Sequence, residues 1–216
     1  MKRWLGVFSL LVLVGGFSVY GQENPWQGLT EEQVQKLKQG EIIILHQEKE
    51  GKEGERLIKA VMILNQSIDE VFNFLCQTER QEEYLPRLER SILIEEDENG
   101  NITEFRIKAL FINIIYRVRH HYDPKHYRLY WELDPNFDND IKHLEGYYQL
   151  YKINEHQTLA RYGTVVILSD LIPRSIQELL TKKDLPKSLG AVKKWIDSGG
   201  KYNKPEYKGV KKQSES

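Results

Sequence analysis

The stretch RVRHHYDPKHYRLYWE, residues 117–132, gathers three histidines, an aspartate and four aromatic rings within sixteen residues. Histidine can bind a metal ion or transfer protons, and a nearby carboxylate can complete either kind of site. In a strand, however, consecutive side chains point to opposite faces, so His120 and His121 cannot bind one metal ion together. The spacing of His120, His126 and Asp123 matches no familiar zinc pattern. We therefore predict no metal site and interpret the stretch as two strands joined by a turn.

Nucleophilic catalysis finds little support elsewhere in the chain. The sequence contains no G-x-S-x-G motif and no glycine-rich phosphate-binding loop. Cys76 is the only cysteine, so no intramolecular disulfide can form, and its apolar neighbours predict a buried, inert thiol. We predict no catalytic residue and no cofactor. An enzyme that uses His120 or a tyrosine as acid or base remains the alternative.

The composition is that of one globular domain with a sizeable core, because 40% of the 216 residues are hydrophobic and 29% are charged. The formal net charge of −1 gives no basic footprint, so we predict no nucleic-acid partner. The mean hydropathy of −0.57 excludes a protein with many membrane spans.

The first 21 residues differ from the rest of the chain. Lys2 and Arg3 precede the apolar run WLGVFSLLVLVGGFSVY, and Val19 and Gly21 suit the −3 and −1 positions of a cleavage site. This arrangement is typical of a secretory signal peptide. We predict that residues 1–21 are cleaved and that the protein is exported, either to the periplasm or out of the cell. An uncleaved anchor is the alternative, although the run is short for a bilayer of about 30 Å.

Residues 22–40 are predicted to form an N-terminal segment with one short helix, which opens at a capping box made by Thr30 and Gln33. Residues 41–50 and 56–64 then predict two strands on either side of the charged turn GKEGE, which together form a hairpin.

A second capping box, Ser67 with Glu70, predicts a helix that reaches about residue 78, followed by the short irregular piece EEYLPRLE. From Ser91 the apolar residues recur with a period of two, which predicts a meander of strands. Asn99-Gly100 predicts a type I′ hairpin turn, because that turn needs positive φ at both central residues. The predicted strands are 91–97, 101–110, 111–122, 126–133, 145–153 and 158–168.

The C-terminal part returns to helical spacing. Pro173 suits the first turn of a helix, Pro186 predicts a kink or break, and Gly199 ends the pattern. We predict that one domain spans residues 41–199 and that residues 200–216 form a basic, flexible tail.

Several of these segments resemble one known superfamily. Residues 60–94, AVMILNQSIDEVFNFLCQTERQEEYLPRLERSILI, resemble the opening strand, two small helices and following strand of START/polyketide cyclase-like (SRPBCC, helix-grip) proteins. Residues 145–168 resemble their penultimate strand pair and residues 171–196 their C-terminal helix, so the resemblance covers about residues 41–197. It implies an α+β helix-grip fold, in which a strongly twisted antiparallel sheet wraps around a long C-terminal helix, with two small helices inserted after the first strands.

The resemblance also implies a hydrophobic tunnel. Members of this superfamily bind or carry lipids, sterols, polyketides or quinones, and a minority are cyclases or hydrolases. No shared catalytic motif carries over to this chain, and its long first hairpin is closer to lipid-transfer START domains.

Strand alternation predicts which side chains line such a tunnel. His120 falls on the face of its strand that carries apolar and aromatic partners, whereas Arg117, Arg119 and His121 share the other face. The predicted lining residues are Phe105, Ile107, Ile114, Tyr116, Val118, His120, Tyr122, Leu129, Trp131, Tyr148, Tyr162, Leu189 and Val192. Alternation does not decide between an open cavity and a filled core.

Our leading hypothesis is an exported protein that binds or transfers a hydrophobic small molecule or lipid in an internal apolar cavity. A cyclase or hydrolase of the same fold is the first alternative, and a partner-binding protein with a filled interior is the second. Lysines crowd the polar side of the last helix, which is typical of a solvated face, although such a face also suits transient contact with anionic lipid head groups. These lysines are Lys182, Lys183, Lys187, Lys193 and Lys194.

Overall fold

The computed structural model describes residues 24–45 and 56–207 of the chain. The helical elements are α1 (Glu31–Lys38), α2 (Ile68–Cys76), the 3₁₀ turn η1 (Thr78–Arg80), α3 (Gln81–Tyr84), α4 (Arg174–Glu178), the π-helical stretch η2 (Leu179–Asp184) and α5 (Leu185–Asp197). The strands are β1 (Ile43–Leu45), β2 (Arg56–Leu64), β3 (Leu88–Asp97), β4 (Gly100–Ala109), β5 (Ile112–Asp123), β6 (Arg128–Leu133), β7 (Ile141–Asn154) and β8 (Gln157–Leu168).

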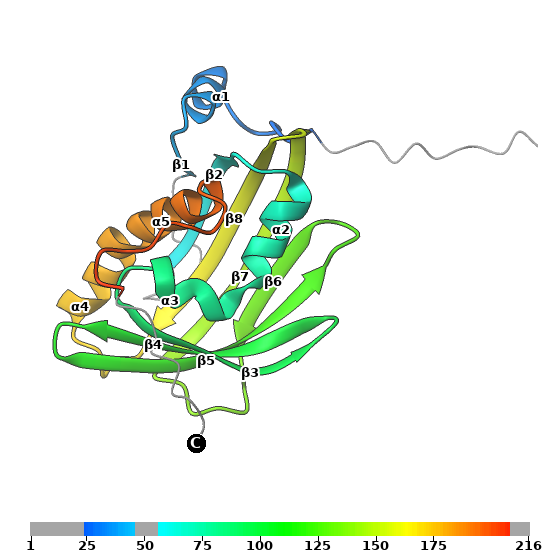
Figure 1. Ribbon diagram of the computed structural model, residues 1–216. Helices are drawn as coiled ribbons and strands as arrows, with labels where there is room; N and C mark the ends of the chain where they lie inside the picture. The colour runs from blue at the N-terminus through cyan, green and yellow to red at the C-terminus, as the bar shows by residue number, and fades with distance from the viewer. Residues whose placement is uncertain (1–23, 46–55, 208–216) are drawn as a thin grey trace, which may run out of the picture.

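The eight strands form one antiparallel sheet in the order β1-β2-β8-β7-β6-β5-β4-β3. Strands β3 to β8 follow one another as hairpins, and the chain crosses from β2 to β3 through α2, η1 and α3. The sheet twists strongly, and the C-terminal helical segment lies across its concave side (Figure 1). This is the α+β helix-grip architecture that the sequence predicts. The predicted turn GKEGE of the first hairpin lies outside the described residues.

The β3–β4 hairpin forms where the sequence predicts it, but its turn differs. Asp97 pairs with Gly100, so the central turn residues are Glu98 and Asn99, and neither Asn99 nor Gly100 has a positive φ. The predicted type I′ turn is therefore wrong. A Cβ at Gly100 would lie 1.9 Å from the backbone oxygen of His120. The glycine is needed because β5 approaches closely, and the turn does not depend on its freedom at positive φ.

Residues 174–197 form one helical segment whose hydrogen bonding changes along its length. The π-helical stretch Leu179–Asp184 separates α4 from α5 and ends just before Pro186. Proline has no N–H for the regular α-helical pattern, so the irregularity lies immediately ahead of it, as the sequence predicts. Within the part of the chain that is described, no helix is both long and apolar enough to cross a membrane.

Both predicted capping boxes are present, and each sets the start of a helix. The Thr30 and Gln33 side chains exchange hydrogen bonds with each other's backbone at α1, and Ser67 and Glu70 do so at α2. Helix α1 buries Leu37 against the outer face of the sheet, in a small cluster separate from the concave side. The N-terminal segment thus covers part of the sheet's outer face.

Residues 201–207 pack against the domain, although the sequence analysis assigned residues 200–216 to a flexible tail. The Lys204 ammonium group donates to the backbone oxygens of Leu85 and Leu88, and the backbone N–H of Lys204 donates to the backbone oxygen of Glu83. These carbonyls flank an irregular loop that lacks regular partners, which explains why the chain folds back here. Residues 208–216 lie outside the described residues.

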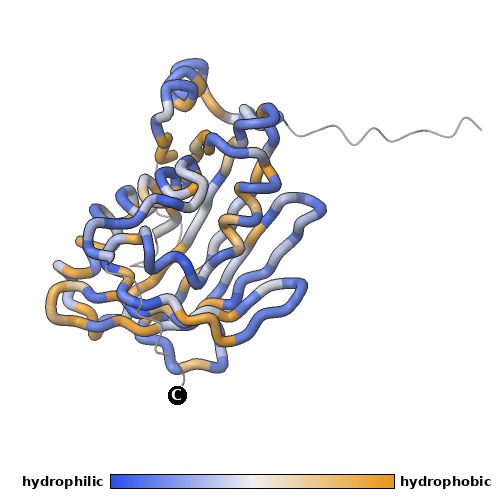
Figure 2. The backbone as a smooth tube through the Cα atoms, viewed as in Figure 1, coloured by the Kyte–Doolittle hydropathy of each residue, from blue (hydrophilic) through white to orange (hydrophobic). Residues whose placement is uncertain are grey.

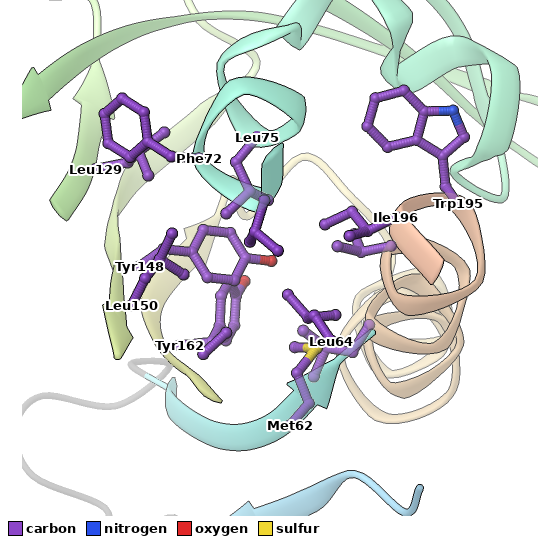
Figure 3. Packing of buried hydrophobic residues seen from close by; sticks show 14 of the residues in the cluster. Met62, Leu64, Phe72, Leu75, Leu129, Tyr148, Leu150, Tyr162, Trp195 and Ile196 are labelled. Carbon is purple, nitrogen blue, oxygen red and sulfur yellow. The ribbon is translucent and has the colours of Figure 1, made fainter. Parts of the chain in front are cut away.

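The main core lies between the concave face and the helices. Trp195 is fully buried, stacks on Tyr84 with ring centroids 4.5 Å apart and meets Phe74 edge-on at 5.1 Å. Met62 and Leu64 of β2 belong to the same buried cluster and lie on the side of α5 that carries Ile196 (Figure 3). Large rings thus fill the space under the C-terminal half of α5.

We predict that Gly100→Ala lowers the free energy of unfolding by ~2 kcal/mol, because overpacking against a neighbouring backbone typically costs ~1–3 kcal/mol. Gly190→Ala in α5 is the matched control. No neighbouring atom lies within 4 Å of its built Cβ, so alanine should stabilise the helix by ~0.5–1 kcal/mol. Urea unfolding measures both, and a neutral Gly100→Ala would contradict the close approach of β5.

Candidate ligand-binding cavity

A cavity of about 280 Å³ lies between the concave face of the sheet and the C-terminal helical segment. Strands β4 to β8 form its wall, the loop after α3 forms one edge, and η2 and α5 form the cover. Most of its lining side chains are aliphatic or aromatic. The interior is therefore an open apolar cavity at this end of the helix, beside the filled core around Trp195.

The structure brings twelve of the thirteen predicted lining residues together around this cavity. They are Phe105, Ile107, Ile114, Tyr116, Val118, His120, Leu129, Trp131, Tyr148, Tyr162, Leu189 and Val192. Tyr122 is the exception, because its hydroxyl donates to the backbone oxygen of Cys76 at 3.0 Å. It lies on the predicted face, but α2 covers that end of the strand. Alternation finds the face of a strand and cannot show where a helix crosses it.

His120 is an uncharged polar group in the cavity wall. Only 8% of its surface is exposed, and its Nδ1 has no hydrogen-bond partner among the described residues. The Phe105 ring meets it edge-on at a centroid distance of 6.1 Å. Burial, together with the neighbouring His121, lowers the pKa of His120 to about 3. The imidazole is therefore neutral at physiological pH and can donate or accept one hydrogen bond from a ligand.

Three tyrosines add further neutral polar groups. Burial raises the pKa of Tyr116, Tyr148 and Tyr162 above the ordinary value, so all three phenols stay protonated. The Tyr148 and Tyr162 rings are 5.0 Å apart, and Trp131 lies 5.6 Å and 5.8 Å from them. Figure 3 shows the hydroxyls of Tyr148 and Tyr162 close together on the side of the cluster that faces α5. This part of the wall offers hydrogen bonds without formal charge.

One ion pair lies at the edge of the cavity. Arg87 Nε donates to Asp184 Oδ2, which joins the loop between α3 and β3 to the end of η2. Among the described lining residues Arg87 is the only cation and Asp184 the only anion. Arg87 also has a φ of 61°, which is unusual for a bulky residue. This pair is not predicted from the sequence, because neither residue belongs to a strand with a recognisable period.

Loop and helix residues make up much of the remaining lining. Leu75, Tyr84, Leu85, Pro86, Leu180, Leu185 and Ser188 come from α2, α3, the following loop and the C-terminal helical segment. The predicted lining includes Leu189 and Val192 of the helix but no loop residue. The hydrophobic pattern of α5 was the available signal for the helix, whereas the loop offered none.

The outer face of the sheet carries the charges that the interior lacks. Burial raises the pKa of Glu104, but hydrogen bonds from Arg106 and Arg117 outweigh this and hold it below the ordinary value. His121 stacks on Tyr130 at 4.5 Å on this same face. His120 and His121 thus point to opposite faces, which confirms the alternation predicted for their strand.

The described residues contain no group of three or more His, Cys, Asp or Glu side chains that could hold a metal ion. Cys76 is partly buried, and burial raises the pKa of its thiol to about 12, with a smaller contribution from Glu96. The thiol therefore stays protonated and is a poor nucleophile.

No family model matches the sequence, and no curated protein matches it. Solved structures do match the fold. An aromatase/cyclase, ZhuI, from Streptomyces sp. R1128 is 13% identical, with a TM-score of 0.57 over 66% of this chain and 94% of that chain. A STAR-related lipid transfer protein from Xanthomonas axonopodis is 14% identical, with a TM-score of 0.55 over 72% and 98%.

A START superfamily protein from Mycobacterium smegmatis is 11% identical, with a TM-score of 0.54 over 66% of this chain and 97% of that chain. Together these likenesses show that the chain has the START/SRPBCC-like helix-grip fold, as its sequence indicates. The neighbours include lipid transfer proteins and cyclases, and both kinds are compatible with ligand binding inside the fold.

We predict that protonation of His120 destabilises the fold as the pH falls from about 6.5 towards 3. In that range the unfolded chain binds a proton at this histidine and the folded protein does not. The free energy of unfolding therefore falls by up to ~1.4 kcal/mol for each pH unit. Above pH 6.5 both states are neutral at this position and the contribution is constant.

Urea unfolding of the native chain and of His120→Gln between pH 7 and pH 4 measures this slope. The variant should lose much of the native pH dependence in this range. The control His156→Gln, at the exposed β7–β8 turn, should keep it. Parallel curves for the native chain and His120→Gln would show that the imidazole is not held neutral by burial.

Proposed function

We propose that this protein binds one small hydrophobic molecule in its internal cavity and shuttles or sequesters it. The observation that carries the proposal is the cavity itself, a largely apolar space with a few neutral polar groups on its wall. Small-molecule sites commonly have this composition, in which apolar surface gives affinity and sparse polar groups give orientation.

Burial is enough to hold such a ligand without covalent chemistry. A ligand that loses ~300 Å² of apolar surface to the cavity gains ~7.5 kcal/mol at about 25 cal/mol per Å². Immobilising the ligand offsets part of this gain, which leaves an affinity suited to uptake and release.

The size of the cavity limits the ligand. Its volume of about 280 Å³ lies just below the ~300–1,000 Å³ typical of ligand pockets. A single acyl chain or a compact ring system therefore suits it better than a lipid with two long chains.

The wall also limits the ligand's polarity. His120, Tyr148 and Tyr162 carry no charge at physiological pH, so the buried end of the ligand should bear an uncharged group such as a hydroxyl or carbonyl. A charged group would be more stable at the edge, beside Arg87 and Asp184.

An enzyme of the cyclase or hydrolase kind remains the alternative, and an aromatase/cyclase is among the structures with this fold. The acid/base groups of the cavity argue against it. A histidine with a pKa of about 3 is a weak base at neutral pH, and buried phenols with raised pKa values are weak acids. Binding is thus better supported than catalysis.

Export is part of the proposal. Residues 1–21 lie outside the described residues, so support for a cleaved signal peptide comes from their sequence pattern. N-terminal sequencing of the chain that cells accumulate should begin at Gln22. An intact N-terminus would instead favour an anchored protein.

The sequence predicts a solvated face for the lysines of the last helix, with contact to lipid head groups as the alternative, but one of them has partners within the protein. Lys193 donates to the backbone oxygen of Ile63 at 2.6 Å and to Asp197 at 2.7 Å. Lys183 and Lys187 are exposed. The basic face of the last helix is thus smaller than its sequence implies, and membrane contact needs a further source of affinity.

We predict that Val166→Trp abolishes, or weakens at least ~10-fold, the binding of the uncharged fluorescent probe N-phenyl-1-naphthylamine. Val166 lines the cavity, and an indole there would occupy much of its space. Val165→Trp is the matched control, because the neighbouring residue on the same strand points to the other face. Fluorescence titration measures the affinities, and thermal unfolding verifies that both variants fold. Equal affinity for the two variants would place the probe outside the cavity.

A further inference from the structure

Two neighbouring turns expose large apolar side chains. Leu110 and Phe111 form the β4–β5 turn and are 63% and 81% exposed, and Leu171 in the β8–α4 connection is 91% exposed. We call these three residues the apolar edge. Contiguous exposed apolar surface on a protein often marks a place of contact with another phase or molecule.

The two turns lie side by side. Ala109 and Ile114 flank the first turn and share one buried cluster with Ile172 and Ile176, which flank the second. The β4–β5 tip and α4 therefore lie at the same end of the molecule (Figure 1), and Figure 2 shows hydrophobic colouring at this end.

The requirements of the turn do not explain the residues at its tip. Ala109 pairs with Ile112, so Leu110 and Phe111 are the two central residues, and Leu110 has a φ of 57°. Asparagine or glycine adopts this conformation at lower cost. A strained, solvent-exposed leucine followed by an exposed phenylalanine is unfavourable for folding and solubility, which points to a role in contact.

The apolar edge is next to one end of the cavity. Ile107, Ile114, Leu168 and Leu180 line the cavity and also belong to, or pack against, the buried cluster beneath the two turns. A partner bound to the apolar edge would therefore lie next to this end of the cavity.

We propose that the apolar edge inserts into the surface of a lipid bilayer and orients this end of the cavity towards it. The proposal rests on the proposed function, since it names the surface from which a hydrophobic ligand is taken or to which it is delivered. Exposed leucine and phenylalanine side chains partition into the boundary between head groups and acyl chains.

The area of the edge argues against a second copy as the occupant. Three side chains of this size bury on the order of 400–500 Å², well below the ~800 Å² per partner of a standard stable interface. A bilayer has no such minimum, because it deforms around projecting side chains.

The charges near the edge predict what kind of bilayer it prefers. Three basic groups beside the two turns have acidic partners: Lys108 with Glu89, Lys142 with Asp170, and Arg174 with Glu178. Such balanced charges give little attraction to anionic lipids. Insertion should therefore be driven by apolar contact, occur on zwitterionic membranes and depend weakly on salt.

Co-sedimentation with phosphatidylcholine vesicles tests the proposal, using the chain as cells accumulate it. The double variant Phe111→Ser, Leu171→Ser should partition at least ~10-fold more weakly than the native chain. Ile94→Ser, which removes an exposed apolar side chain from the edge strand β3, should partition like the native chain. Equal partitioning of the double variant and the native chain would overturn the proposal.

A local probe separates this edge from any other membrane-binding part of the chain. An environment-sensitive fluorophore on the thiol of Phe111→Cys, in a Cys76→Ala background, should shift to the blue when vesicles are added. The same fluorophore on Glu155→Cys, at the opposite end of β8, should not. An unshifted probe at position 111 would contradict insertion. Insertion would also be contradicted if the native chain self-associates but does not bind vesicles, and the double variant no longer self-associates.

Titration with N-phenyl-1-naphthylamine on the same proteins keeps the two proposals apart. Vesicle binding without probe binding would support the membrane contact of the apolar edge and contradict the proposed ligand binding. Probe binding without vesicle binding would support ligand binding and contradict the membrane contact.

Discussion

The fold depends on keeping the concave face of a strongly twisted sheet away from water. One helical segment, residues 174–197, supplies most of the cover, and its two halves do so differently. Around Trp195, stacked and edge-on rings fill the space between helix and sheet. Around Leu185 and Ser188 the helix follows a π-helical stretch and leaves about 280 Å³ open. The same cover thus provides a packed core at one end and a cavity at the other.

The two faces of the sheet differ in charge, because the helical segment shields only the concave face from water. The outer face holds paired charges such as Glu104 with Arg106, whereas the enclosed wall holds phenols and an imidazole that burial keeps neutral. An interior of this kind disfavours charged ligands and acid/base catalysis at neutral pH, since both need groups that accept charge readily. Such a wall suits the binding by burial that we propose.

Much of this arrangement could be predicted from the sequence, because a period of two fixes which side chains share a face. Ten predicted strand residues line the cavity for this reason, and His120 and His121 separate as expected. Leu189 and Val192 follow instead from the helical spacing of α5. The failures have other physical causes. Tyr122 lies under α2, and Gly100 is required by the close approach of β5. Lys204 binds the backbone oxygens of Leu85 and Leu88, so residues 201–207 fold back onto the domain. Each depends on tertiary packing that a local pattern does not contain, as does the pairing of Arg87 with Asp184.

The central claim is that the cavity is a site for one small hydrophobic ligand and not a packing defect. Native mass spectrometry of the chain purified from its own cells tests this most directly. We expect a fraction of the protein to carry one non-covalently bound molecule that organic solvent extracts, in a one-to-one ratio. This molecule should be lost when Val166 is replaced by tryptophan. A protein that carries no such molecule, and that takes up none when mixed with extracts of cellular lipids, would contradict it.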